Sequence, residues 1–386
     1  MKKKVLILTL NDYIIYQPTI LNLYDHLLPH FDVTVVSFKP AAGNKTKDET
    51  RNVIYLKTNF FLRQFFQKTD FICSKIFKGV KKIFPKAEYH YTYYNKYLPY
   101  LLRRHVKKHP VEDALIIVTD FPALFSVQDL YESVHFLSLE IENNSNPIHQ
   151  KVDRSKVRSV FIQSEERYNY LFPGLKIPTF YIQNAPVFSN DNIRNFERKD
   201  FIWSGAMDRR LAIFDCLDFF DAYPQYKLVM KGAAERKVLN GINKHYIHLI
   251  KEARIRIDRE YLPASAFLDF LSHFRYGFAF YSWELISQSF NYATAPSGKL
   301  FMNLAAGVPV IACDIPGFKL VKDFNAGVLI SDYKPETIHA AMLQIEEHYE
   351  LYSQGCYKAA EYFSFDKRVA TYIDFLLKEA STSSDT

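Results

Sequence analysis

Short apolar runs rich in β-branched residues alternate with segments of helical periodicity in the first half of the chain. A strand that is apolar throughout is typical of a parallel sheet, in which helices cover both faces. The alternation with helices, the first of them at 17–28, predicts βαβ units. The predicted strands are 4–10, 33–38, 114–119, 135–139, 159–163 and 179–182.

A second series of the same kind follows a polar stretch at 189–198, which has the composition of a linker. The sequence therefore predicts an α/β protein with two Rossmann-like domains, at 1–186 and 187–365, and a C-terminal segment, 366–386, whose helix packs back on the first domain. The predicted helices of the second domain are 211–222, 264–271 and 299–306. Its predicted strands are 201–204, 227–230, either 246–250 or 253–257, 277–281, 308–313 and 327–330.

Composition agrees with two ordinary globular domains, since the 386 residues are 48% hydrophobic and 24% charged. The basic N-terminus precedes only six mostly apolar residues, too few for a signal peptide. No apolar stretch approaches the roughly 18 to 20 residues that span a bilayer. The four cysteines, at 73, 216, 313 and 356, are scattered and predict reduced thiols. We expect a cytoplasmic protein.

The positive charge of the chain is concentrated in one segment. Residues 57–108 hold 13 Lys or Arg against Asp70 and Glu88, a net charge of +11, whereas the whole chain carries +7. Within this segment, 61–86 has apolar and basic residues on different helical faces. Such a helix binds an anionic membrane surface, or it is a solvated basic face over an ordinary core stripe. No nucleic-acid-binding motif accompanies it, so no nucleic acid partner is expected. The apolar positions are Phe61, Phe65, Ile72, Ile76, Val80 and Ile83, and the basic ones are Lys68, Lys75, Lys78, Lys82 and Lys86.

The best candidate for a phosphate site is the predicted helix start around Ser297, Gly298 and Lys299. Ligands of open α/β sheets bind at the carboxyl ends of strands, where helix N-termini attract anions. Gly298 permits close approach of the backbone, and Lys299 adds a cation where the helix dipole disfavours one. A bound anion would resolve that conflict. A Ser-capped helix with a solvent-directed lysine is the alternative.

The segment 296–312, PSGKLFMNLAAGVPVIA, resembles the donor-site segment of retaining GT-B glycosyltransferases of family four. Segments 164–167, 181–186, 201–205 and 227–232 are similar to other conserved pieces of that family. The resemblance implies two Rossmann-like domains facing across a cleft and a nucleotide sugar bound by the C-terminal domain. It also implies hexosyl transfer, with retention, to a bacterial polysaccharide or glycolipid at the inner membrane.

The resemblance also implies roles for individual residues. Arg210, or Arg209, and Lys231 would grip the diphosphate and stabilise the charge that grows on it as it leaves, so Arg210 and Lys231 are candidate catalytic residues. A solvated helix start and a surface strand end are the alternatives for these cations. The expected donor-binding residues are Ser204, Gly205, Arg209, Arg210, Lys231, Ser297, Gly298, Lys299 and Asn303.

Two family positions depart from the pattern. The family commonly has two Glu residues where this chain has Thr294 and Met302, and the second binds ribose hydroxyls; Asn303 is the candidate substitute. GT-B enzymes generally need no metal, and the sequence has no Asp-x-Asp pair. No metal or other cofactor is therefore expected.

The acceptor side is predicted from two acids at strand ends in the first domain. Asp120 follows one predicted strand, and Glu140, a third candidate catalytic residue, follows the next and could orient an acceptor hydroxyl or accept its proton. A capping or linker-bonded carboxylate is the alternative for Glu140, and His135 is expected to be a packed or exposed histidine and not a base. Two further readings of the whole chain remain: a catalytically silent GT-B protein that binds sugar nucleotides or a partner, and a sugar-nucleotide epimerase.

Overall fold

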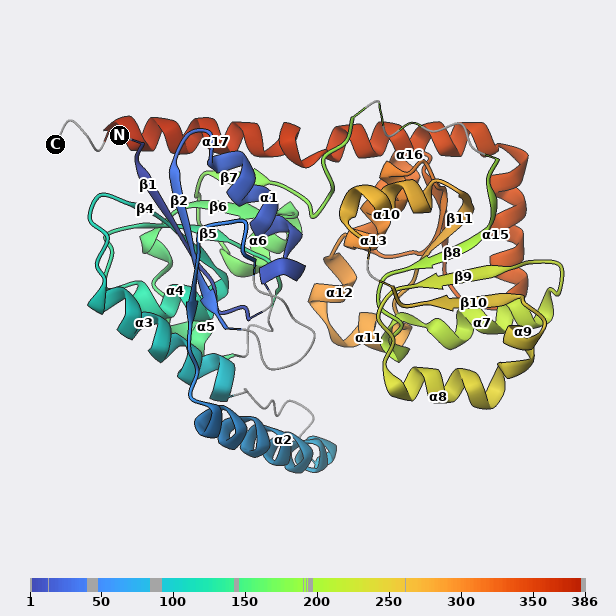
Figure 1. Cartoon of the computed structure of the whole chain (residues 1–386), viewed down its shortest axis with the longest axis horizontal. Coiled ribbons are helices and arrows are strands. Elements are labelled where there is room, and N and C mark those ends of the chain that lie inside the picture. The colour runs from blue at the N-terminus through green and yellow to red at the C-terminus, as the bar shows by residue number, and fades with distance from the viewer. Residues whose placement is uncertain are drawn as a thin grey trace. The chain divides into compact units, whose positions relative to one another are not determined.

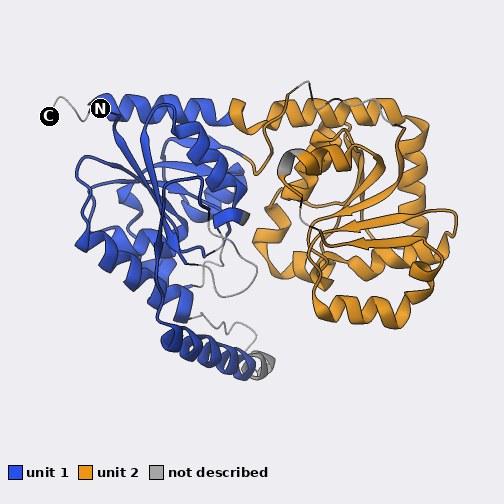
Figure 2. Cartoon of the chain, viewed as in Figure 1, with its two compact units in different colours: residues 1–182, 368–386 blue, residues 183–367 orange. Residues whose placement is uncertain are grey.

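In the computed structural model, the chain folds into two compact units (Figures 1 and 2). Unit 1 comprises residues 1–182 and 368–386, and unit 2 comprises residues 183–367. The structure describes residues 2–12, 14–39, 48–83, 92–141, 146–189, 191, 193, 197–260 and 262–382.

Unit 1 contains a seven-stranded parallel sheet with the order β3-β2-β1-β4-β5-β6-β7. The chain starts at the middle of the sheet, builds outward to β3, and then returns to add β4 on the other side of β1. Six strands were predicted, and the short edge strand β3 was not. The strands are β1 (Lys4–Leu8), β2 (Asp32–Phe38), β3 (Val53–Leu56), β4 (Leu115–Thr119), β5 (Val134–Leu137), β6 (Val157–Ile162) and β7 (Thr179–Tyr181).

The helices of unit 1 include one long amphipathic helix, α2. Its predicted range, 61–86, includes 84–86, which lie outside the described residues. The helices are α1 (Pro18–Leu27), α2 (Phe60–Ile83), α3 (Leu98–Lys108), α4 (Asp120–Val127), α5 (Pro147–Lys151) and α6 (Glu165–Leu171), with the short π-helix η2 (Tyr93–Tyr97) before α3.

Unit 2 contains a six-stranded parallel sheet with the order β10-β9-β8-β11-β12-β13, which repeats the winding of the first sheet. Of the two alternatives for its third strand, the structure has the later one, and the earlier apolar run is the short helix α9. The strands are β8 (Lys199–Ser204), β9 (Leu228–Lys231), β10 (Ile255–Asp258), β11 (Phe274–Ala279), β12 (Val310–Cys313) and β13 (Gly327–Ile330).

Helices flank this sheet on both faces, with α7 packing beside α15 and α13 beside α16. They are α7 (Ile213–Ala222), α8 (Arg236–His245), α9 (Ile247–Lys251), α10 (Ala264–Leu271), α11 (Trp283–Gln288), α12 (Phe290–Thr294), α13 (Gly298–Ala305), α14 (Lys319–Asp323), α15 (Pro335–Glu347) and α16 (Tyr349–Phe363).

The C-terminal helix α17 (Phe365–Thr382) leaves unit 2 and joins unit 1 from residue 368 onward. Within unit 1, Glu379 pairs with Arg158 at 2.9 Å, and the ring of Phe375 contacts that of His135. The contact boundaries, 182/183 and 367/368, differ by a few residues from the sequence-based boundaries of 186/187 and 365/366. The two doubly wound parallel sheets confirm the predicted fold class.

Candidate functional site

Each sheet has one position where the winding reverses, between β1 and β4 in unit 1 and between β8 and β11 in unit 2. The loops that leave the two central strands there run in opposite directions and open a crevice at the carboxyl ends of the strands. Ligands of doubly wound folds bind in this crevice. The fold therefore defines two places, one in each unit, where the predicted donor and acceptor residues are expected to lie.

In unit 2, the backbone passes very close to itself just beyond β8 and β9. Gly205 has φ +104° and Gly232 has φ +146°. A Cβ added to Gly232 would lie 2.1 Å from the carbonyl oxygen of Gly205, so any side chain there would collide with backbone. The Gly205 amide donates to the Lys231 carbonyl at 2.8 Å. These two glycine turns form one edge of the β8/β11 crevice.

Lys299 lies in the same crevice. Its Nζ donates to the Phe280 carbonyl at 3.1 Å and lies 4.7 Å from the ring centre of Trp203 and 5.5 Å from that of Tyr281. Burial lowers the pKa of the Lys299 ammonium to about 8. Within the described residues this ammonium forms no ion pair, so its partly buried charge has no carboxylate beside it.

The helix that carries Lys299 has an N-cap residue whose side chain does not cap it. Ser297 is the N-cap of α13, but its side chain makes no capping hydrogen bond to the helix. Ser297 is buried, and a Cβ added to Gly298 would meet Asn184 at 3.1 Å. Helix N-termini of this kind bind anions through their first amide groups. Ser297, Gly298, Lys299 and Gly205 are thus brought together; a Cβ on Gly205 would stand 3.9 Å from that of Lys299.

Arg209 and Arg210 lie in the short 3-10 helix η5 (Arg209–Leu211) after the first glycine turn. The Arg210 guanidinium is 61% exposed and pairs with Asp208, which raises its pKa. The Arg210 carbonyl accepts from the Ser282 amide at 2.8 Å, which fixes η5 beside the loop that follows β11. Arg209 is exposed and stacks over the ring of Phe214. A ligand can therefore reach both guanidinium groups, but Arg210 must release the Asp208 carboxylate before it can bind the ligand.

Lys231, which was expected to grip the diphosphate, does not present a free cation. Its side chain is almost completely buried, and its Nζ pairs with Asp258 at 2.8 Å and lies over the ring of Phe270. Lys231 and Asp258 are direct register partners on β9 and β10. The charge of Lys231 is thus already compensated within the sheet.

Two further predicted donor residues are interior. Ser204 is buried, and its hydroxyl has no hydrogen-bond partner in the described part of the chain. Asn303 is fully buried, and its amide packs against the backbone of Gly277 on β11, where an added Cβ would meet it at 2.8 Å. Neither polar atom of the Asn303 amide has a partner among the described residues.

In unit 1, a cavity of about 140 Å³ lies at the β1/β4 reversal. Asp120 lines it and has φ +60°, and its Oδ1 accepts from the amides of Leu139 and Glu140 at 3.0 and 3.4 Å. The two predicted acceptor-side acids are therefore neighbours. Glu140 is exposed and lies three residues beyond the end of β5. The other lining residues are Thr9, Leu10, Asn11, Tyr94, Thr119, Pro122 and Leu139.

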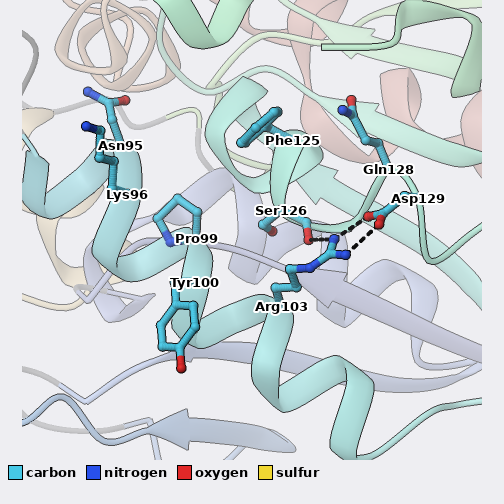
Figure 3. A pocket seen from close by; sticks show the side chains of 9 residues that line it. All are labelled: Asn95, Lys96, Pro99, Tyr100, Arg103, Phe125, Ser126, Gln128 and Asp129. Atoms are coloured by element: carbon cyan, nitrogen blue, oxygen red, sulfur yellow. Dashed lines mark hydrogen bonds and ion pairs between the residues drawn. The ribbon is translucent and has the colours of Figure 1, made fainter. Parts of the chain in front are cut away.

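A larger cavity of about 550 Å³ lies in unit 1 between α3, with the preceding η2, and the end of α4 (Figure 3). Arg103 crosses one side of it, donating to the Ser126 carbonyl and pairing with Asp129. This cavity lies between two helices and away from the strand ends. The candidate acceptor site is the smaller cavity, because it contains Asp120 at the reversal of the sheet.

Sequence reasoning did not identify several residues of these two sites. Trp203 precedes Gly205 within a segment that was singled out, but only the fold shows that its ring lies under Lys299. The hydroxyls of Thr9 and Thr119 are 2.9 Å apart; Thr9 directly follows β1, and Thr119 is the last residue of β4. Their position directly after buried apolar runs is the signal that could have found them.

No described helix is long and apolar enough to cross a bilayer. No three His, Cys, Asp or Glu side chains of the described part come together as a metal site would require.

Comparison with known proteins was made at the level of sequence and of structure. No family model and no curated protein matches the sequence. Among solved structures, the chain is similar to an α,α-trehalose-phosphate synthase (UDP-forming) from Burkholderia vietnamiensis, with a TM-score of 0.64, 10% identity, and coverage of 98% of this chain and 100% of that chain.

Two other solved structures are similar over the same extent. Anabaena HepE in complex with UDP and glucose has a TM-score of 0.63 and 12% identity over 99% of this chain and 100% of that one. Sucrose-phosphate synthase from Thermosynechococcus elongatus has a TM-score of 0.63 and 11% identity over 99% of this chain and 100% of that one. At such low identity the likeness establishes the fold, which is GT-B.

Proposed function

We propose that this chain is a glycosyltransferase that binds a nucleotide sugar in the β8/β11 crevice of unit 2 and transfers its glycosyl group to an acceptor held in unit 1. Lys299 carries the proposal. Its ammonium is partly buried beside a helix start and has no carboxylate partner among the described residues. A diphosphate would supply the missing negative charge and accept hydrogen bonds from the first amide groups of α13.

The chemistry of transfer suits these residues. The bond between the anomeric carbon and the diphosphate oxygen breaks, and its electron pair leaves with the diphosphate. The oxygen of the acceptor hydroxyl forms the new bond to the anomeric carbon and gives up its proton. Lys299 and the amide of Gly298 would stabilise that charge, and Arg210 would add a bidentate contact after releasing Asp208. The backbone amide of Glu140 is held by the Asp120 carboxylate, and the Glu140 side chain would orient the attacking acceptor hydroxyl or take its proton. These cations supply positive charge where a metal would, so we propose that no metal or other cofactor is needed.

Narrower features of the function are also proposed. The resemblance of 296–312 to retaining enzymes favours hexosyl transfer with retention, and one structural neighbour is described as a system for glycosyltransfer with retention. Neighbours that are UDP-forming or bound to UDP make UDP-sugars the first donors to test. We further propose a glycan or lipid-linked acceptor at the inner membrane surface. The four free cysteines fit a reducing, cytoplasmic location.

Thermal unfolding of the full chain against UDP-, GDP-, ADP-, CDP- and dTDP-sugars tests the donor site. One nucleotide class should raise the unfolding temperature of the wild type, because the ligand binds only the folded state, and should have no effect on Lys299→Ala. Equal stabilisation of both proteins would contradict the assignment. Binding without any nucleotide release, in the presence of acceptor-containing membrane extract, would favour the catalytically silent alternative.

A further inference from the structure

Helix α2 exposes an unusual amount of apolar surface. Among the side chains of α2 that the structure describes, seven large apolar ones are exposed, whereas the sequence left open that its apolar stripe packs in a core. Phe61, Phe65, Ile72 and Ile76, which repeat at spacings of four, seven and four, are 80, 62, 56 and 61% exposed. The other three are Phe60, Leu62 and Phe71. An apolar surface of this kind indicates a partner.

The opposite face of α2 fixes how the helix is oriented on unit 1. Arg63 pairs with Asp12, which follows β1, at 3.0 Å. The carboxylate of Asp70 accepts from the amides of Thr92 and Tyr93 at 3.0 Å each. The ring of Phe66 packs on that of Tyr97 at 5.1 Å. These contacts hold one face inward, so the face of Phe61, Phe65, Ile72 and Ile76, called here the outer face, is presented in a defined direction.

The charge around the outer face has a single sign. Asp70 is the only acidic residue of α2 and is buried, and Arg63 is already paired. Lys68 and Lys75 are exposed, and Lys78, Lys81 and Lys82 follow in the last turns of the helix. A second copy of the helix would bring the same positive charges together. An anionic bilayer surface, in contrast, accepts both the apolar side chains and the lysines.

We propose that α2 is an interfacial helix, which lies in the surface of an anionic phospholipid membrane with its outer face inserted among the acyl chains and its lysines among the headgroups. This proposal stands without glycosyl transfer. It also has a consequence that rests on the proposed function: η2, on which α2 packs, contributes Tyr94 to the acceptor cavity. A membrane-docked α2 would hold that cavity near the headgroups, which favours a lipid-linked acceptor.

Co-sedimentation of the full chain with vesicles tests this proposal. Vesicles of phosphatidylcholine alone are compared with vesicles containing about 30% phosphatidylglycerol, at low salt and with excess salt. The outer-face variant is Phe61→Ser with Phe65→Ser and Ile72→Ser, and the charge variant is Lys68→Glu with Lys75→Glu. The control variant, Leu343→Ser with Leu351→Ser, removes apolar side chains of unit 2 that are 51 and 53% exposed.

Wild type and control should bind the anionic vesicles, and each α2 variant should bind at least about tenfold more weakly. Binding of the outer-face variant equal to wild type would overturn the proposal, as would a wild type that ignores anionic vesicles. A wild-type dimer in sedimentation analysis that dissociates only in the outer-face variant would also overturn the proposal, because the outer face would then bind a second copy of the chain. Unchanged unfolding temperature verifies the fold of each variant. Nucleotide binding in unit 2 is measured in parallel, so a failure of lipid binding and a failure of the donor site remain distinguishable.

Discussion

The ammonium of Lys299 lies 4.7 Å from the centre of the Trp203 indole, and together the two residues connect the elements that diverge at the reversal of the second sheet. Trp203 belongs to β8 and is fully buried, whereas Lys299 is the second residue of α13 and donates to the carbonyl of Phe280, just beyond β11. The ring face partly compensates the charge. It provides no full negative charge, so we expect the site to bind an anion.

Replacement of Lys299 by Met should separate stability from function. The variant removes a charge whose burial lowers its pKa to about 8, so the unfolding temperature at pH 7 should rise by about 2 to 4 °C. Nucleotide-sugar affinity should fall at least about tenfold, or about 1.4 kcal/mol, in isothermal titration calorimetry.

The matched control is Lys251→Met, an exposed lysine at the end of α9, near the amino ends of the strands. It should change neither quantity. A lower unfolding temperature for Lys299→Met, with unchanged binding, would assign Lys299 a purely structural role.

The same lysine predicts how binding depends on pH. Its folded-state pKa of about 8 lies below the ordinary 10.5, so Lys299 is charged at neutral pH and loses its proton as the pH rises through 8. Affinity for a nucleotide sugar should be flat below pH 8 and fall above it, by up to about tenfold per pH unit, because binding then requires uptake of a proton.

Calorimetry between pH 6.5 and 10 should show this fall in the wild type, whereas Lys299→Arg, which stays charged, should bind with an affinity that hardly changes. Stability moves in the opposite direction. Between pH 8 and 10.5 the unfolded chain holds the proton that the folded chain has lost, so this group makes the free energy of unfolding rise with pH. A wild-type affinity that is independent of pH over this range would show that the Lys299 charge does not contact the ligand.

The contact between the two glycine turns predicts a strong effect of one methyl group. In Gly232→Ala the new Cβ would lie 2.1 Å from the carbonyl oxygen of Gly205, at a φ of +146°. The turns must separate, which should lower the free energy of unfolding by about 2 to 4 kcal/mol in urea titrations and also weaken nucleotide binding. Gly174→Ala has φ +74° with nothing within 4 Å of the added Cβ, and should cost only about 1 kcal/mol. Equal costs for both variants would mean that the turns adapt easily.

The strands could be predicted where burial gives a single strand a recognisable apolar pattern in the sequence. The central strands are apolar throughout because helices cover both faces, and β4 and β8 were located within one or two residues at most ends. Edge strand β3 has four residues and none is fully buried, so it lacks that signal. The apolar run at 246–250 has the length of a strand but forms helix α9, an ambiguity that periodicity alone does not resolve.

The site was predictable only as far as position along the chain determines it. Ser297, Gly298 and Lys299 are consecutive, so their joint presence at one helix start follows from the sequence. The pairing of Lys231 with Asp258 depends instead on the register between β9 and β10, to which residues 27 positions apart contribute. The same holds for Asp120, whose hydrogen bonds reach a loop 19 and 20 residues further along the chain. Such tertiary contacts leave no local pattern.

Asp120 allows the acceptor site to be tested separately from the fold. Its carboxylate accepts two amide hydrogen bonds, from Leu139 and Glu140, and its backbone has φ +60°. Asp120→Asn keeps an oxygen acceptor and a residue that tolerates this conformation, so stability should change by no more than about 0.5 kcal/mol. Asp120→Ala loses both hydrogen bonds and is strained at this φ, and should cost about 2 to 3 kcal/mol in urea unfolding.

If the negative charge of Asp120 also acts on the acceptor, Asp120→Asn should reduce glycosyl transfer by at least about tenfold. Nucleotide-sugar affinity should stay at the wild-type value, since we propose that the donor binds in unit 2. Glu132→Gln removes an exposed acid just before β5, near the amino ends of the strands, and should alter neither quantity. Wild-type transfer by Asp120→Asn, together with the loss of stability in Asp120→Ala, would instead limit Asp120 to holding the Glu140 loop in place. Glu140→Gln would then be the variant in which the loss of transfer must be found.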